Sequence, residues 1–119
     1  MRFVLLINGL PESRAATVAL RFARALIASR HTILAVFFNQ HGVRHAHPVA
    51  EVDAGGEIPH QCWAELAGSG DFPLLVCRAA WARRSSAPLP SSWQASGLAE
   101  FAELSEQADR VVTFGTGGG

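Results

Sequence analysis

The sequence predicts a single α/β domain in which helices cover both faces of a parallel β-sheet, the layering of flavodoxin-like folds. The first observation is length, because 119 residues are enough for one hydrophobic core that needs no disulfide or metal. The second is that apolar runs of strand length alternate with segments whose apolar residues recur at helical spacing. Repeated strand-helix units predict a parallel sheet, with functional sites at the carboxyl ends of the strands.

The first half of the chain is predicted to form two strands and a helix. Residues 2–8 are a largely apolar run that ends in a turn signal, Asn8-Gly9. Between Glu12 and about Ser29, helical spacing is shown by Ala16, Ala19, Leu20, Ala23, Leu26 and Ile27. Residues 31–39 are β-branched and aromatic, which predicts a second strand. Residues 41–59 contain too many Gly, Pro and His for a regular element, so we expect an exposed connection there.

The second half is predicted to repeat the strand-helix pattern. Residues 59–68 form a short helix, and residues 72–76 form a third, buried strand that leads directly into Cys77. The remaining elements are a helix at 78–84, a proline-containing loop at 85–92, a helix at 97–108 and a last strand at 110–114. We expect residues 1–115 to form the domain and residues 116–119 to be a flexible, glycine-rich tail.

Composition excludes several function classes. The net charge is zero, all ten basic residues are Arg, and no run of like charge would attract nucleic-acid phosphates or an anionic membrane. The apolar start is too short to span a bilayer, and Pro11 and Glu12 follow it instead of a cleavage site. We therefore expect a cytoplasmic protein without direct nucleic-acid or membrane binding. Cys62 and Cys77 have no CxxC spacing, which indicates free thiols.

Cys77 stands out in the segment PLLVCRAAWARR, where a buried strand is followed at once by an arginine-rich helix. Backbone N–H groups at a helix start, together with Arg78, Arg83 or Arg84, would favour the thiolate form and would also stabilise a persulfide. The alternative is that Cys77 is a small buried hydrophobic residue. Spacing alone leaves both interpretations open.

Five segments, in the same order along nearly the whole chain, resemble the DsrE/TusD family of sulfur-relay proteins. They are MRFVLLINGLP, FARALIASRH, AVFFNQHGVRHA, LLVCRAAWARR and LAEFAELSEQADRVVTF. The resemblance implies a DsrE-like parallel sheet between helices, and a sulfurtransferase in which Cys77 carries sulfur as a persulfide without a bound cofactor.

The resemblance also implies partners. These are a sulfur donor protein, a DsrC/TusE-like acceptor, and DsrF/TusC-like and DsrH/TusB-like subunits in a hetero-oligomer that feeds either tRNA thiolation or sulfur oxidation. Composition points the same way, since 49% of the residues are hydrophobic and 17% are charged, against about 25% charged in typical soluble domains. Some apolar surface should therefore face another subunit, or a second copy when the chain is alone, and Trp93 is a candidate contact.

The segment HGVRHAH offers a second chemistry. His41, His45 and His47 could join Cys77 or Cys62 as metal ligands, or His41 or His45 could lie beside Cys77 as an acid or base during sulfur handover. Cys62, next to Trp63, is expected to be a packing residue. Three function classes thus remain: a persulfide-relay sulfurtransferase subunit, a non-catalytic interaction subunit of a related complex, and a metal-binding or redox-sensing module.

Overall fold

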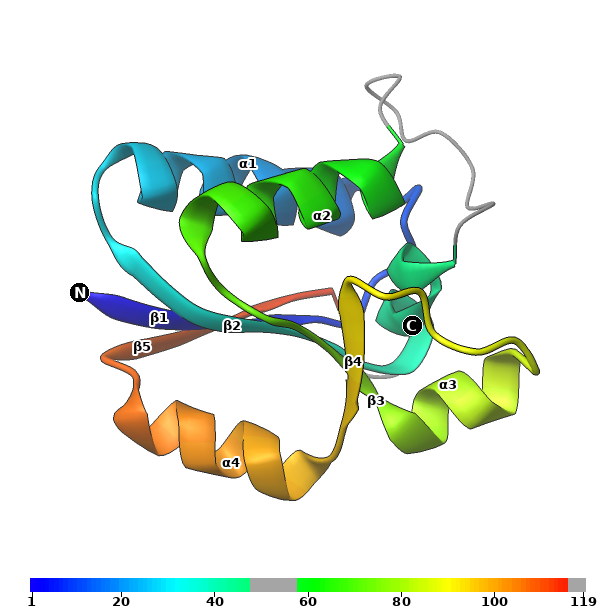
Figure 1. Cartoon of the computed structure of the whole chain (residues 1–119). Coiled ribbons are helices and arrows are strands. Elements are labelled where there is room, and N and C mark those ends of the chain that lie inside the picture. Colours follow the sequence, from blue (N-terminus) through cyan, green and yellow to red (C-terminus); the bar gives the residue numbers. More distant parts are fainter. Residues whose placement is uncertain (48–57, 116–119) are drawn as a thin grey trace.

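The computed structural model describes residues 1–47 and 58–115, and it has the predicted α/β architecture. Two helices, α1 (Arg14–Ala28) and α2 (Pro59–Gly70), cover one face of a sheet, and α4 (Leu98–Gln107) covers the other (Figure 1). A further short helix, α3 (Arg78–Arg84), extends from the edge of the sheet beside a 3-10 helix, η1 (Gln40–Ala46). Within these residues no helix is both long and apolar enough to cross a membrane.

The sheet is parallel throughout, and its strand order explains the two helical layers. The order is β4 (Trp93–Ser96), β3 (Leu74–Cys77), β2 (Thr32–Phe38), β1 (Arg2–Ile7) and β5 (Arg110–Phe114). From β1 to β3 the chain steps toward one edge through α1 and α2, and from β4 it returns through α4 to pair β5 with β1. Because such crossovers are right-handed, a reversal of direction moves the connecting helix to the opposite face.

Local sequence accounts for the helix boundaries. Helix α1 begins two residues after Glu12 because the Ser13 hydroxyl accepts the backbone N–H of Ala16 at 3.1 Å, which caps the first turn. Its buried residues follow the predicted helical spacing and are Ala16, Ala19, Leu20, Ala23 and Leu26. Helix α2 starts with Pro59 and runs two residues beyond the predicted end, to Gly70, where Asp71 adopts a left-handed conformation (φ 55°).

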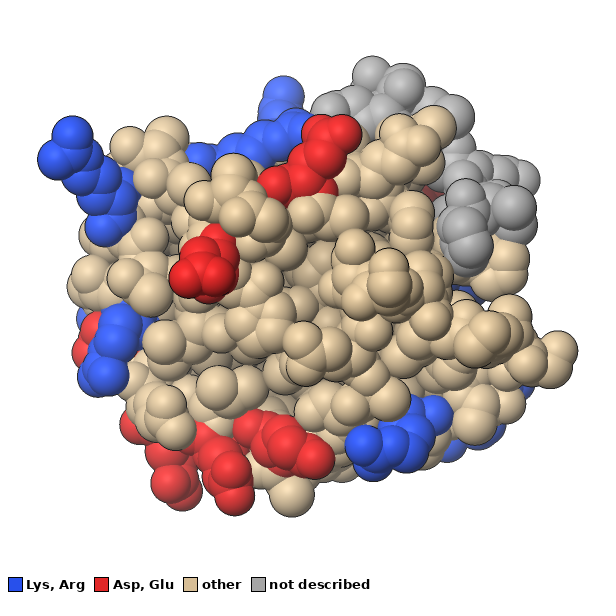
Figure 2. Space-filling view, in the orientation of Figure 1, with Lys and Arg blue, Asp and Glu red and all other residues tan. Residues whose placement is uncertain are grey.

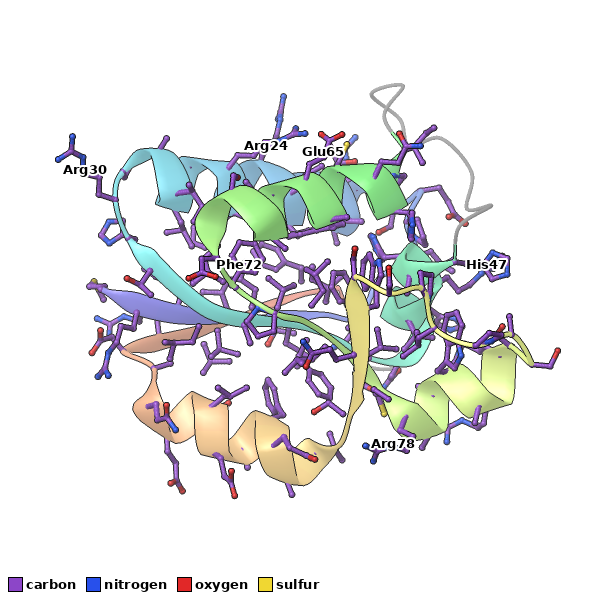
Figure 3. All side chains as sticks on the ribbon, in the orientation of Figure 1. Arg24, Arg30, His47, Glu65, Phe72 and Arg78 are labelled. Atoms are coloured by element: carbon purple, nitrogen blue, oxygen red, sulfur yellow. The ribbon has the colours of Figure 1, made fainter. Side chains whose placement is uncertain are left out.

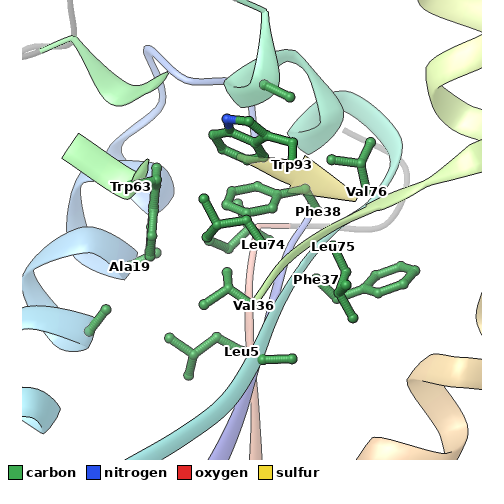
Figure 4. Packing of buried hydrophobic residues seen from close by; sticks show 14 of the residues in the cluster. Leu5, Ala19, Val36, Phe37, Phe38, Trp63, Leu74, Leu75, Val76 and Trp93 are labelled. Carbon is green, nitrogen blue, oxygen red and sulfur yellow. The ribbon is translucent and has the colours of Figure 1, made fainter. Parts of the chain in front are cut away.

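The core lies mainly between the sheet and the α1–α2 layer, and its largest residues are aromatic (Figure 4). The ring of Phe38 lies 5.5 Å from that of Trp63 and 4.9 Å from that of Trp93, between ring centroids. Trp93, which the sequence marked as a candidate contact surface, is 4% exposed and belongs to this core. The α4 layer is thinner, because no residue of α4 is fully buried, although the ring of Phe101 packs 5.1 Å from that of Phe37.

Part of the predicted exposed connection is a packed helix, so that prediction is wrong for its first residues. In η1 the residues Gly42, Val43, His45 and Ala46 are buried. Gly42 allows this, because a Cβ at its position would lie 2.0 Å from the carbonyl oxygen of Ile7. The glycine therefore permits close backbone contact with β1 and does not mark an exposed loop. The rest of that connection, residues 48–57, lies outside the described residues, as does the tail 116–119.

Strand β4 is a second feature that the sequence did not predict. Its four residues pair with β3 and form an edge of the sheet. A run of four residues is too short to show a clear period. The consequence for function is direct, because β4 ends beside Cys77.

Candidate active site

Cys77 lies at the carboxyl end of β3, as the sequence predicted, and it is also the residue that precedes the first turn of α3. Its partner in the neighbouring strand is Ser96, the last residue of β4. Cys77 is 8% exposed, and neither it nor Cys62 is part of a disulfide. The thiol is therefore held by the sheet at the edge where functional groups of parallel sheets gather.

Strand alternation places Cys77 on the α4 face of the sheet. Successive side chains of a strand point to opposite faces, so Cys77 shares a face with Leu75, and Val76 faces the other way. Leu75 is paired with Phe37, whose ring packs against Phe101 of α4. Val76 is paired with Phe38, which packs against Trp63 of α2.

Cys77 opens into a pocket of about 420 Å³ between the ends of β3 and β4 and the starts of α3 and α4. Its lining residues are Cys77, Arg78, Ala79, Ala82, Ser96, Gly97 and Leu98. Most of the wall is apolar or small, and Leu98 at the mouth is 64% exposed. The pocket is thus an open, mainly apolar recess to which the described residues contribute one thiol, one hydroxyl and one guanidinium group.

Of the three arginines proposed to support Cys77, only Arg78 lines the pocket. Figure 3 shows Arg78 at the start of α3, on the side of the sheet that α4 covers. Its guanidinium reaches the start of α4, because a Cβ on Gly97 would lie 3.9 Å from the Arg78 Nη1. Arg83 and Arg84 are exposed in the last turn of α3, and Arg84 Nη1 donates to the Ala80 carbonyl at 3.3 Å.

The surface around the pocket carries both signs of charge. Exposed acidic residues of α4, namely Glu100, Glu103 and Glu106, gather at the bottom of the view in Figure 2, and basic groups lie near the start of α3. The Glu100 carboxylate caps its own helix by accepting the Gly97 backbone N–H at 3.0 Å. Within the described chain, no field of one sign surrounds Cys77.

The histidines expected beside Cys77 lie elsewhere, because neither His41 nor His45 lines its pocket. His45 is fully buried on the opposite face of the sheet, where its ring lies 5.2 Å from that of Phe38. Its Nε2 donates to the Gly9 carbonyl oxygen at 3.2 Å, and its Nδ1 has no hydrogen-bond partner. Burial lowers the pKa of His45 from 6.5 to about 4, against the opposing effect of the Gly9 hydrogen bond.

The other two histidines of that segment have different surroundings. His41 is half-buried in η1, and the ring of His47 lies 6.4 Å from the ring of Trp81 in α3. Among the residues that the structure describes, no three His, Cys, Asp or Glu side chains are grouped so that they could hold a metal ion. His41, His45 and His47 thus do not form a metal site with Cys77 or Cys62 in this part of the chain.

Sequence reasoning missed three residues of the pocket, Ser96, Gly97 and Leu98. All three follow from the overlooked strand β4, whose register places Ser96 opposite Cys77. The available signal was Gly97, which follows the short run WQAS and is the first residue of the predicted last helix. Such a glycine is typical of the close approach between a strand end and a helix start.

Fold and site together define a small α/β protein that presents one thiol in an open pocket at the carboxyl edge of a parallel sheet. The chain belongs to the DsrE/DsrF-like family, whose family model matches residues 1–114. It is 35% identical to the sulfurtransferase TusD homolog of Pseudomonas aeruginosa, with 97% of this chain and 98% of that protein covered. It is 32% identical to sulfurtransferase TusD of Cronobacter sakazakii, over 96% of this chain and all of that protein.

A solved structure agrees with the fold. The crystal structure of the ychN protein from E. coli superimposes with a TM-score of 0.81 at 25% sequence identity, covering 96% of this chain and 99% of that one. The family resemblance noted in the sequence is therefore confirmed, and so is the fold class.

Proposed function

We propose that this protein is a sulfurtransferase subunit that accepts sulfane sulfur as a persulfide on Cys77 and passes it on. The observation that carries the proposal is the position of Cys77, at the carboxyl edge of the sheet and in the wall of an open pocket. The names of the TusD relatives support sulfur transfer as the activity. Cys62, in α2, does not line this pocket.

The chemistry needs only thiol exchange. The Cys77 thiolate attacks the outer sulfur of a donor persulfide, R–S–SH, so that a new S–S bond forms at Cys77 as the S–S bond of the donor breaks. The donor leaves as the thiolate R–S⁻ and takes up the proton of the outer sulfur to become R–SH, which leaves Cys77 as a persulfide anion. An acceptor thiolate then attacks the outer sulfur, and the Cys77 thiolate leaves. No net oxidation or reduction occurs, so the reaction requires no bound cofactor.

Arg78 supports the persulfide anion that forms in this cycle. Its guanidinium cannot be deprotonated in a protein, and it lines the same pocket as the thiol. Positive charge in the wall of the pocket favours the persulfide anion over its protonated form. Arg83 and Arg84, in the last turn of α3, add only distant positive potential.

We further propose that the subunit works inside a cytoplasmic hetero-oligomer with DsrF/TusC-like and DsrH/TusB-like subunits, and that it delivers sulfur to a DsrC/TusE-like acceptor. Leu98, exposed at the mouth of the pocket, gives an incoming protein an apolar contact next to the reacting thiol. The relay would end in thiolation of tRNA or in sulfur oxidation.

The test is intact mass spectrometry after incubation with a cysteine desulfurase and cysteine. The parent protein and Cys62→Ser should gain the mass of a sulfur atom, and Cys77→Ser should not. The low exposure of Cys77, 8%, favours one alternative, a subunit that keeps the fold but acts only through assembly. Absence of any sulfur gain by the parent protein, with a donor that loads a control thiol, would support that alternative.

A further inference from the structure

Among the described residues, Ser96 is the one that brings a hydroxyl group to the lining of the Cys77 pocket. It is the register partner of Cys77 in the parallel pair β3–β4, so both side chains point to the same face of the sheet. Ser96 is 4% exposed, which makes it one of three buried polar residues in the described chain. A polar side chain buried to this degree normally has a hydrogen-bond partner.

In the described part of the protein the Ser96 hydroxyl makes no hydrogen bond, and its oxygen is not one of the fully buried side-chain atoms that lack a partner, so the hydroxyl is open to the pocket. The backbone N–H of the next residue, Gly97, is bound to the Glu100 carboxylate at 3.0 Å. The hydroxyl is therefore available to donate a hydrogen bond to a group that enters the pocket during the working cycle.

The distance between the strands that carry Ser96 and Cys77 indicates which group could accept a hydrogen bond from the Ser96 hydroxyl. Adjacent strands lie about 4.8 Å apart, yet Ser96 makes no hydrogen bond with the Cys77 Sγ in the described structure. A persulfide carries a second sulfur about 2 Å beyond the first, out in the pocket that both side chains line. That outer sulfur is anionic at neutral pH, and a hydroxyl donor to an anion makes a stronger hydrogen bond than one to a neutral group.

We infer that Ser96 is a positioning residue that donates a hydrogen bond from its hydroxyl to the outer sulfur of the Cys77 persulfide. The inference rests on the proposed function, since it assigns a role within the same site. Arg78 supplies positive charge from another wall of the pocket, and the Ser96 hydrogen bond fixes the orientation of the outer sulfur. Together they hold the outer sulfur toward the mouth at Leu98, where an acceptor thiolate can attack in line with the S–S bond.

Ser96 keeps its proton throughout the cycle. During loading, the outer sulfur moves from R–S–SH to the Cys77 thiolate, the donor leaves as R–SH, and the Ser96 hydroxyl donates to the new persulfide anion. During handover, the acceptor takes the outer sulfur and the Cys77 thiolate leaves, which frees the hydroxyl again. The hydrogen bond thus exists only in the loaded state.

The experiment measures the loading equilibrium and the reactivity of the empty thiol separately. In a Cys62→Ser background, the parent site, Ser96→Ala and Ser96→Thr are equilibrated with mixtures of glutathione persulfide and glutathione, and intact mass gives the loaded fraction. The same proteins, unloaded, are alkylated with iodoacetamide. We expect Ser96→Ala to lower the loading equilibrium constant about tenfold, since hydrogen bonds to charged groups are the stronger ones. Ser96→Thr should restore it, and alkylation rates should agree within about twofold.

Equal loading constants for the parent site and Ser96→Ala would overturn the inference. A parallel loss of loading and alkylation in both Ser96 variants would also overturn it, because it would indicate a role in holding the strand ends. Failure of the parent site itself to load would instead refute the proposed function, and the inference with it. A thermal unfolding curve for each variant checks that the fold is intact.

Discussion

Acid should destabilise this protein through His45. The histidine is fully buried, and burial lowers its pKa from 6.5 to about 4. In the unfolded chain the imidazole takes up a proton as the pH falls below about 6.5, whereas in the folded protein it stays neutral down to about 4. Between these values the unfolded state binds more protons, so the free energy of unfolding falls as the pH falls.

The size of the effect follows from the two pKa values. At pH 5 the unfolded histidine is almost fully protonated and the folded one almost fully neutral, which costs about 2 kcal/mol relative to pH 8. The loss levels off below about pH 4, where both states are protonated, at roughly 3 kcal/mol. For a domain of this size that is a substantial part of a total stability of about 5–15 kcal/mol.

The assay is urea unfolding followed by tryptophan fluorescence at pH 8 and pH 5. His45→Gln keeps an amide N–H for the Gly9 carbonyl but cannot titrate, so its stability should fall by about 2 kcal/mol less than that of the parent between the two pH values. His41→Gln, a change of a half-buried residue in the same 3-10 helix, is the matched control and should behave like the parent. An equal fall in the parent and in His45→Gln would refute the reasoning.

Two structural predictions use matched pairs of variants and the same unfolding assay at pH 8. Gly42→Ala should destabilise the protein by at least about 3 kcal/mol, because the added Cβ would lie 2.0 Å from the Ile7 carbonyl oxygen. Its control is Gly68→Ala, in open space on α2, which should stabilise the protein by up to about 1 kcal/mol. A tolerated Gly42→Ala would show that η1 does not pack against β1 as described. Ser13→Ala should lower the free energy of unfolding by about 1 kcal/mol through loss of the α1 cap. Its control is Ser69→Ala, at an exposed serine near the end of α2, which should change stability by less than about 0.5 kcal/mol. Equal effects of the two variants would rule out capping by Ser13.

The sequence correctly predicted the elements that are long enough to show a clear hydrophobic period. The alternation of apolar runs with helical spacing predicted every strand except β4 and all four α-helices, with boundaries within about two residues. Cys77 was located correctly at a strand end for the same reason, because the run Leu74–Val76 is apolar on both faces. This is typical of a parallel strand that is covered on each side.

The missed features depend on contacts between segments far apart in the chain. Gly42 looks like a loop residue until the carbonyl of Ile7 is placed against it, and His45 looks solvated until Phe38 is seen to cover it. Arg78, Arg83 and Arg84 are equivalent candidates in the sequence, and only the position of α4 shows that Arg78 alone among them lines the pocket. Ser96 could not be found without the register of β4 against β3.

The most direct test of the central claim is to find the atom that carries the sulfur. The protein is incubated with a persulfide donor whose outer sulfur is isotopically labelled, alkylated to preserve persulfides, digested and analysed by peptide mass spectrometry. We predict one labelled sulfur atom on the peptide that contains Cys77, absent from the Cys62 peptide and removed by dithiothreitol. Label on the Cys62 peptide instead, or a Cys77 peptide that stays unlabelled while a control thiol protein is loaded, would contradict the account.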